Sequence, residues 1–472
     1  MPAPASLLSV TDALQLYQAG QPAQAATVLR RLLKQQPDQD QALGMLGMIE
    51  AELGHDDRAV NLFRKCIKLN PAHPEWPIEL GKCLTRLGQL DAATSALGQA
   101  LALQPLSLEA WLCLGNVQLR QDRVDDAVAS FERAVTVAPT QAKAHFNLAV
   151  ALLESHRPDR AVAVLRQALS LQPRYATAHN NLGVALLELG EFRDAEAHFH
   201  QALAQDASLA DAALNLHGLA LDQGDLAAAL TWLERCVQWA PQHPTYRFHL
   251  GLLHQQLGNT HAASQAWALR STDPTWKANL ASWRYLSAQS PQPRLLGSAG
   301  RLFALALQQA RPDGLVLEFG VYHGNSIRQL ARLVDQPIHG FDSFAGIPEA
   351  WHDERAGSYS TGGQLPQVPA HVQLHAGWFR DTLPAFLAAH AGQPVRFANI
   401  DCDLYSSTVT VLDALAPHLV AGSVLVFDEF ISNPTWQQDE YKAFHEAARR
   451  HGWRHEVLAY SFLTKQVAIR LS

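Results

Sequence analysis

Four acidic residues follow two neighbouring apolar runs near the C-terminus. Asp401 and Asp403 come after the first run, and Asp428 and Glu429 come after the second. If both runs are strands of one sheet, the carboxylates lie close together, and residues two apart in an extended chain point to the same side. Clustered carboxylates repel one another unless protons or a cation compensate. Because Mg²⁺ prefers oxygen ligands, we expect Asp401, Asp428 and Glu429 to ligate Mg²⁺ or another divalent cation.

The remaining acid, Asp403, is suited to general-base chemistry. A metal ion lowers the pKa of an alcohol bound to it, and a nearby carboxylate can then take the proton. We therefore predict Asp403 and Asp401 as catalytic residues. The reverse assignment, with Asp401 as the base and Asp403 as the ligand, stays open, and so does an exposed acidic cap without a metal.

A glycine-containing turn follows an earlier apolar run. Gly320 and Gly324 permit a tight turn and a close approach of a ligand to the backbone. Their spacing is GxxxG, so the GxGxxG fingerprint of dinucleotide binding is absent. Glu318, at the end of the run, suits an amine or hydroxyl donor. Asp342, 24 residues later, is placed to accept hydrogen bonds from a ribose diol.

These features together suit S-adenosylmethionine, a cationic nucleoside without phosphates. Ser326 and Ser343 stand in the same two segments, and Trp378 lies in a later one. We predict that all three contact this cofactor, although Trp378 could instead pack in the core. Residues 346–369 are rich in Gly, Pro and Ser, which is typical of a substrate lid or of a disordered surface insertion.

The N-terminal half contains a repeat of 34 residues. Seven positions are spaced 34 residues apart, and proline occupies six of them: Pro37, Pro71, Pro105, Pro139, Pro173 and Pro241. Ala207 occupies the seventh. An alanine and, four residues later, a bulky apolar residue keep the same step, as in Ala127 and Phe131. This spacing is helical, glycine marks the turn between helices, and proline ends the second helix.

After residue 274, short apolar runs alternate with helical patterns. Expected strands are 315–319, 338–341, 372–375, 396–400, 423–427, 455–460 and 466–471, and expected helices are 326–333, 382–391, 408–415 and 437–451. This alternation predicts a doubly wound, mainly parallel, seven-stranded α/β (Rossmann-like) sheet, so the fold class is α plus α/β. We expect a repeat domain at 1–274 and a second domain at 275–472 that folds alone unless the two share a core.

The repeats resemble the tetratricopeptide repeat, over about eight copies. Trp111, Leu114, Gly115, Ala127 and Phe131 form part of the clearest copy. The resemblance implies a helical superhelix whose groove binds a protein or peptide. The inner-helix asparagines are candidates for this contact, or are merely polar residues on a wet face: Asn147, Asn180, Asn181 and Asn215.

The second domain resembles the macrocin O-methyltransferase family. The similarity rests on five segments in order, LEFGVYHGNSI, GFDSFAGIPE, GWFRDTLP, IDCDLYSST and VFDEF. The resemblance implies a class I S-adenosylmethionine-dependent methyltransferase that uses a divalent metal, usually magnesium, and methylates sugar hydroxyls. Glu318, Gly320, Gly324 and Asp342 would line the cofactor pocket. Glu429 departs from the family, because many relatives have a second aspartate there.

Composition excludes several classes of protein. The 472 residues carry 37 basic and 44 acidic side chains, a net charge of −7, which disfavours a nucleic-acid partner. Five cysteines without a CxxC pair fit a reducing cytoplasm. We find no secretory signal and no apolar run of the roughly 20 residues that a membrane span needs.

The sequence therefore predicts a metal-assisted O-methyltransferase that acts on a small-molecule or glycan hydroxyl. The repeat arm would recruit a protein partner or the substrate. The alternative is an interaction scaffold whose methyltransferase domain binds the cofactor without turnover. A nucleotide-sugar glycosyltransferase is disfavoured by the glycine spacing.

Overall fold

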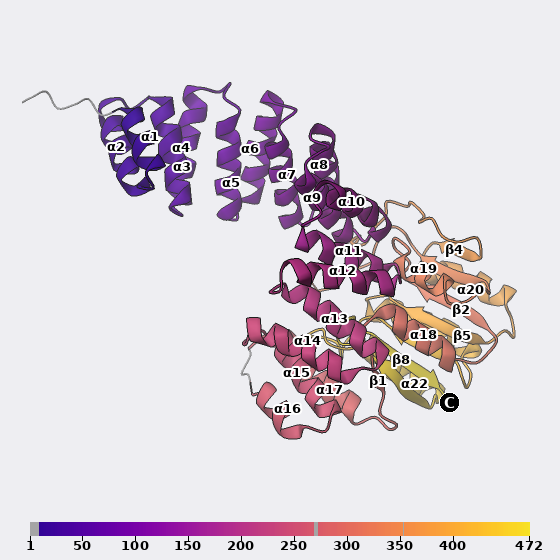
Figure 1. Cartoon of the computed structure of the whole chain (residues 1–472). Helices are drawn as coiled ribbons and strands as arrows, with labels where there is room; N and C mark the ends of the chain where they lie inside the picture. The colour runs from indigo at the N-terminus through magenta and orange to yellow at the C-terminus, as the bar shows by residue number, and fades with distance from the viewer. Residues whose placement is uncertain (1–8, 269–271, 353) are drawn as a thin grey trace, which may run out of the picture. The chain divides into compact units, whose positions relative to one another are not determined.

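The computed structural model describes residues 9–268, 272–352 and 354–472 (Figure 1). The chain divides into two compact units. One contains residues 1–155 and 160–173, and the other contains 156–159 and 174–472. The second unit therefore includes the last repeats together with the C-terminal sheet. The expected boundary between residues 274 and 275 remains a prediction.

The first repeats are built from antiparallel helix pairs. In the pair α7 (Leu108–Arg120) and α8 (Val124–Val137), Ala127 and Phe131 are fully buried. A Cβ atom on Gly115 would lie 2.6 Å from the Phe131 ring, so glycine is required for the close contact between the helices. The other helices up to residue 171 are α1 (Val10–Gln18), α2 (Pro22–Gln35), α3 (Asp40–Glu52), α4 (Asp56–Leu69), α5 (Glu75–Arg86), α6 (Leu90–Leu103), α9 (Ala142–Glu154) and α10 (Pro158–Leu171).

The second unit begins with three more helix pairs and one further helix. These are α11 (Ala176–Glu188), α12 (Phe192–Gln205), α13 (Ala210–Gln223), α14 (Leu226–Trp239), α15 (Pro244–Gln256), α16 (Thr260–Ala266) and α17 (Pro274–Ser287). Its remaining helices are α18 (Ala299–Gln309), α19 (Asn325–Ala331), α20 (Phe379–Ala389), α21 (Tyr405–Leu415), the short 3₁₀ helix η1 (Ala416–His418) and α22 (Glu440–His451).

The C-terminal sheet has the order β1-β7-β8-β6-β5-β2-β3-β4. Its strands are β1 (Arg294–Leu295), β2 (Leu315–Phe319), β3 (Ile338–Asp342), β4 (Val372–Ala376), β5 (Val395–Ile400), β6 (Val424–Phe427), β7 (His455–Tyr460) and β8 (Val467–Leu471). All seven expected strands are present. The expected number is nevertheless wrong, because the described residues form an eighth strand, β1, which pairs with β7. β8 is antiparallel to both of its neighbours, and the other pairs are parallel.

Alternating side chains give the sheet two buried faces. On β2, Val316 packs in a cluster with α18 and α19, whereas Leu317 and Phe319 pack in a second cluster with α20, α21 and α22. A strand buried on both sides reads as a continuous apolar run, as observed here. The doubly wound α/β class that the alternation predicted is confirmed.

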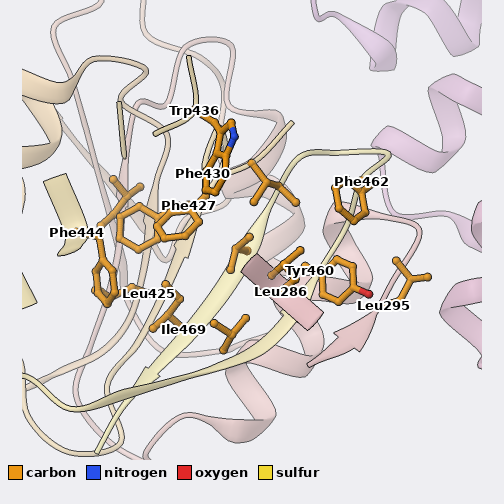
Figure 2. Packing of buried hydrophobic residues seen from close by; sticks show 14 of the residues in the cluster. Leu286, Leu295, Leu425, Phe427, Phe430, Trp436, Phe444, Tyr460, Phe462 and Ile469 are labelled. Carbon is orange, nitrogen blue, oxygen red and sulfur yellow. The ribbon is translucent and has the colours of Figure 1, made fainter. Parts of the chain in front are cut away.

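The last repeats and the sheet share one hydrophobic core. Figure 2 shows Leu286 of α17 beside Tyr460 and Leu295, residues that belong to the same cluster as Leu252 of α15. Phe248 of α15 meets Phe462 edge to face, with ring centroids 4.7 Å apart. These contacts favour a shared core, and the expectation that residues 275–472 fold alone stays a prediction.

Backbone contacts tighten the same junction. A Cβ atom on Gly297 would lie 1.9 Å from the carbonyl oxygen of Gly218 on α13, so only glycine fits there. The carboxylate of Asp222 accepts hydrogen bonds from the backbone nitrogens of Gly297 and Ser298 and from the Ser298 hydroxyl. Helix α13 is thus fixed to the segment that leads into α18.

A buried histidine pair in this core is expected to make the protein sensitive to acid. Burial lowers the pKa of His217 to about 4 and, with the neighbouring His217, the pKa of His249 to about 3. Below pH ~6.5 the unfolded chain binds protons that the folded chain does not, so stability falls with falling pH, by about 1.4 kcal/mol per pH unit for each histidine. We expect the wild type to lose more thermal stability between pH 7 and pH 5 than His249→Gln, as measured by circular dichroism. Equal losses would contradict this assignment.

Candidate functional site

A cavity of about 480 Å³ opens at the carboxyl ends of the central strands. β2 has β3 on one side and β5 on the other, so the strand order reverses at this point. In open α/β sheets, ligands bind outside the carboxyl ends of the strands where the order reverses. The cavity has the size of a small-molecule site.

The glycine turn after β2 forms one wall. Gly320 has a φ of 87°, and a Cβ atom there would lie 1.8 Å from the carbonyl oxygen of Asp401. Glycine therefore allows the turn to approach the end of β5. The backbone nitrogens of Val321 and Tyr322 each donate to Asp342 Oδ2 at 2.8 Å. Asp342 thus holds the turn, a role that its spacing from Glu318 did not predict.

Asp342 has little acceptor capacity left for a ribose. Its Oδ1 atom also accepts a hydrogen bond of 2.6 Å from the backbone nitrogen of Phe344. A carboxylate offers about four acceptor sites, and three are used. A ribose hydroxyl would take the fourth.

Most of the predicted site residues line this one cavity. They are Gly320, Ser326, Asp342, Ser343, Trp378, Asp401, Asp403, Asp428 and Glu429. Glu318 and Gly324 are not among the lining residues. Gly324 instead precedes α19 with a φ of 78°.

Glu318 is fully buried behind the turn. Its Oε1 atom accepts a hydrogen bond of 2.7 Å from the Ser326 hydroxyl. Burial, together with the charges of Asp428 and Asp342, raises its pKa to about 8. The carboxyl group of Glu318 therefore stabilises the turn through its hydrogen bond with Ser326.

The acidic residues after β5 and β6 form another part of the wall. β5 ends at Ile400, and Asp403 has a φ of 58°, so the extended geometry expected for Asp401 and Asp403 is wrong. Both still reach the cavity. Burial and the neighbouring carboxylates raise the pKa of Asp401 well above its usual range, and burial and the charge of Asp428 raise that of Asp403 to about 7.

The expected metal ligands have the right donor chemistry but already bind protein groups. Lys465 Nζ lies 2.9 Å from Glu429 Oε1, and Gln466 donates to Asp428 Oδ1 at 2.6 Å. The part of the chain that the structure describes contains no group of three His, Cys, Asp or Glu side chains arranged to hold an ion. Carboxylate oxygens are nevertheless the type of ligand that Mg²⁺ prefers.

Three residues of this wall were missed from the sequence. Glu440, at the start of α22, is buried and accepts hydrogen bonds from the backbone nitrogens of Cys402 and Glu429. It therefore ties the loops after β5 and β6 together. Lys465 and Gln466 come from the connection between β7 and β8, and no local pattern in the sequence predicts that this connection lies here.

The segment 346–369 contributes a further wall. Gly346, Ile347, Pro348, Trp351 and Tyr359 line the cavity. The Ser406 hydroxyl donates to Glu349 at 2.6 Å, and Ala345 forms a β-bridge with Ser360. These contacts favour the lid interpretation over a disordered insertion.

Comparisons with known families separate the two halves of the chain. Residues 9–216 match the family described as the cilia and flagella-associated protein 70 C-terminal domain, and residues 209–235 match the tetratricopeptide repeat. Residues 317–430 match the family described as a methyltransferase domain. No described helix has the length and apolar character to traverse a bilayer.

Two similar proteins are O-methyltransferases. The 8-demethyl-8-(2,3-dimethoxy-alpha-L-rhamnosyl)-tetracenomycin-C 4'-O-methyltransferase of Streptomyces olivaceus is 30% identical over 142 residues, covering 25% of this chain and 53% of that protein. Demethyldecarbamoylnovobiocin O-methyltransferase of Streptomyces niveus is 26% identical over 157 residues, covering 28% of this chain and 58% of that protein. The chain thus spans about half the length of the curated relatives it matches.

Some solved structures are similar to part of the chain. MamA is 24% identical with a TM-score of 0.33, and the match covers 34% of this chain and 95% of MamA. PilF of Pseudomonas aeruginosa is 18% identical with a TM-score of 0.40, covering 46% of this chain and 96% of that protein.

Proposed function

We propose that this chain, which joins tetratricopeptide repeats to a methyltransferase domain, transfers a methyl group from S-adenosylmethionine to the hydroxyl of a sugar or glycan. The observation that carries the proposal is the single cavity at the switch point of the sheet. Its walls combine the glycine turn, Asp342 and the carboxylates after β5 and β6. The printed name of the Streptomyces olivaceus relative specifies a rhamnosyl group, which supports a sugar acceptor.

The residues of the cavity divide into two roles. S-adenosylmethionine supplies, when bound, a methyl group on a positively charged sulfur. Gly320 lets the cofactor approach the backbone, and Asp342 keeps one lone pair free to accept a hydrogen bond from a ribose hydroxyl. Trp378 offers an aromatic face to the cofactor. Asp403 accepts the proton of the acceptor hydroxyl, because a carboxyl group with a pKa near neutrality is an effective general base. Holding both reactants in one cavity supplies orientation.

We further propose that Asp401, Asp428 and Glu429 hold a divalent cation. The cation lowers, when bound, the pKa of an alcohol that coordinates it. Buried carboxylates that repel one another favour a cation among them. To bind the cation, Glu429 must give up its ion pair with Lys465. The Lys465 ammonium group therefore competes with the metal ion for Glu429.

The alternative is a scaffold that binds the cofactor without turnover. The four carboxylates after β5 and β6 argue against it, because a site used for cofactor binding alone has no need of a buried general base. We also propose that the repeats bind a protein or peptide partner. A reducing compartment such as the cytoplasm agrees with the five free cysteines.

Calorimetry with S-adenosylmethionine, followed by a mass-spectrometric assay with sugar acceptors, tests the proposal. We expect binding, methyl transfer, and loss of transfer in EDTA that Mg²⁺ restores. Absence of binding would remove both the enzyme and the scaffold, whereas binding without transfer to any acceptor would favour the scaffold. Full activity in EDTA would reject the proposed metal site. Lys465 would then be the positive group that compensates the carboxylates after β5 and β6.

A further inference from the structure

One wall of the cavity comes from the repeats. Glu188 is the last residue of α11, and it lines the cavity together with Ala299 and Phe303 of α18 and Ser326 and Gln329 of α19. From the sequence, we expected the repeats to recruit a protein partner or the substrate, and a contribution to the cavity wall was not predicted.

Two buried acceptor oxygens in this wall have no donor among the described residues. They are Glu188 Oε2 and Gln329 Oε1. The Gln329 amide nitrogen is occupied, because it donates to the backbone carbonyl of Glu188. Unpaired buried acceptors cost free energy, so a pair of them on residues that line a cavity indicates a ligand that brings donors.

The position of Glu188 is fixed by packing on both sides. A Cβ atom on Gly300 would lie 2.8 Å from the Phe192 ring, so glycine lets the start of α12 pack against α18. Arg332, directly after α19, forms an ion pair of 3.9 Å with Glu191. The turn between α11 and α12 is thereby held against α18 and α19.

We infer that Glu188, with Gln329, binds the ammonium group of a ligand in the cavity, and that this group is the α-ammonium of S-adenosylmethionine. The inference rests on the proposed function. An ammonium group has three donors and no acceptor, which matches two free acceptor oxygens. The cofactor is the favoured source because Ser326 and Gln329 lie on the helix that directly follows the glycine turn.

The charge state of Glu188 agrees with this role. Burial alone raises its pKa to about 7, with no positive group contributing. A bound ammonium group would supply the missing charge and favour the ionised carboxylate. Cofactor binding then couples the last repeats to the catalytic half through a direct contact.

The test compares Glu188→Gln with the wild type by calorimetry, using two ligands. S-adenosylhomocysteine carries the amino acid part, and methylthioadenosine has the same nucleoside without it. We expect Glu188→Gln to bind S-adenosylhomocysteine at least about tenfold more weakly and methylthioadenosine unchanged, as for the loss of a charged hydrogen bond. Glu234→Gln is the matched control, because this exposed glutamate of α14 does not line the cavity and makes no contact that positions Glu188.

A second measurement needs only the wild type, in case Glu188→Gln folds poorly. Near pH 7, binding of an ammonium group drives a proton from Glu188, so the binding enthalpy of S-adenosylhomocysteine depends on the ionisation enthalpy of the buffer. We expect this dependence for S-adenosylhomocysteine and not for methylthioadenosine. Its absence would overturn the inference.

The possible failures are distinguishable. A wild type that binds neither S-adenosylmethionine nor S-adenosylhomocysteine rejects the proposed function itself. If the wild type binds and Glu188→Gln binds equally well, the ammonium site is rejected while the proposed function stands. Unchanged S-adenosylhomocysteine binding with weakened binding of an amino-sugar acceptor would assign the ammonium group to the acceptor and overturn its assignment to the cofactor.

Discussion

A fragment that begins at Thr275 is expected to be insoluble or to lack fixed tertiary structure. It loses α13 and α15, whose side chains fill one side of the core around Tyr460 and Phe462. Exposing a buried leucine or phenylalanine costs about 1.5–3 kcal/mol, and several are exposed here. Since the free energy of unfolding of a domain is only about 5–15 kcal/mol, this loss is comparable with the entire stability of the domain. Near-UV circular dichroism and size-exclusion chromatography measure the outcome.

A fragment that begins at Arg174 is the control, because it keeps the second unit except for residues 156–159. We expect it to give a near-UV spectrum and a cooperative melt. A single substitution tests the same junction in the full chain. Gly297→Ala places a Cβ atom 1.9 Å from a backbone oxygen, whereas the Cβ of Gly98→Ala meets no atom within 4 Å. Native-like melting of the Thr275 fragment would contradict the shared core.

Two repeat helices at this core, α13 and α15, are buried on more sides than the repeat pattern alone predicts. A helix on a protein surface has one apolar stripe, whereas a helix that is buried all round has none. In α13, residues 216–222 are all buried, and in α15 residues 248–253 are all buried. Both helices lie in repeats with the regular 34-residue spacing, so the repeat pattern did not indicate that they are more deeply buried.

The regular elements were predictable because their patterns are local. The fusion of tetratricopeptide repeats to a methyltransferase domain is confirmed, and so is the alternation of strands and helices after residue 315. β1 was missed, because its two residues carry no period. Its place beside β7 depends on tertiary packing, which also gives the sheet its eighth strand.

The cavity was only partly predictable for the same reason. Residues at strand ends were found, since the topology of parallel strands brings them together. Glu188 and Gln466 line the cavity from a repeat helix and a strand connection. Glu440 and Lys465 do not line it but contact Glu429, which does, and nothing local in the sequence marks any of these residues. Lys465 matters most for interpretation, because it pairs with an expected metal ligand.

The second large effect is expected from Asp403→Asn, which keeps the shape of the side chain and removes its ability to accept a proton. Loss of a positioned general base typically lowers kcat by about 10²–10⁴-fold. We expect this loss in the methyl-transfer assay, with the affinity for S-adenosylmethionine unchanged in calorimetry. Asp413→Asn is the matched control, because this half-exposed aspartate on α21 pairs with Arg450 away from the cavity.

The same assay separates the two assignments that the sequence left open. If Asp401 is the base, Asp401→Asn carries the loss of kcat, and Asp403→Asn instead weakens metal binding. Their environments differ, since Asp401 is buried among Asp428, Asp403 and Glu440 while Asp403 also feels the positive charge of Lys465. A carboxylate close to a positive charge ionises more readily, whereas one surrounded by negative charge needs a bound ion to do so. This contrast favours Asp403 as the base, and wild-type kcat in Asp403→Asn would reject it.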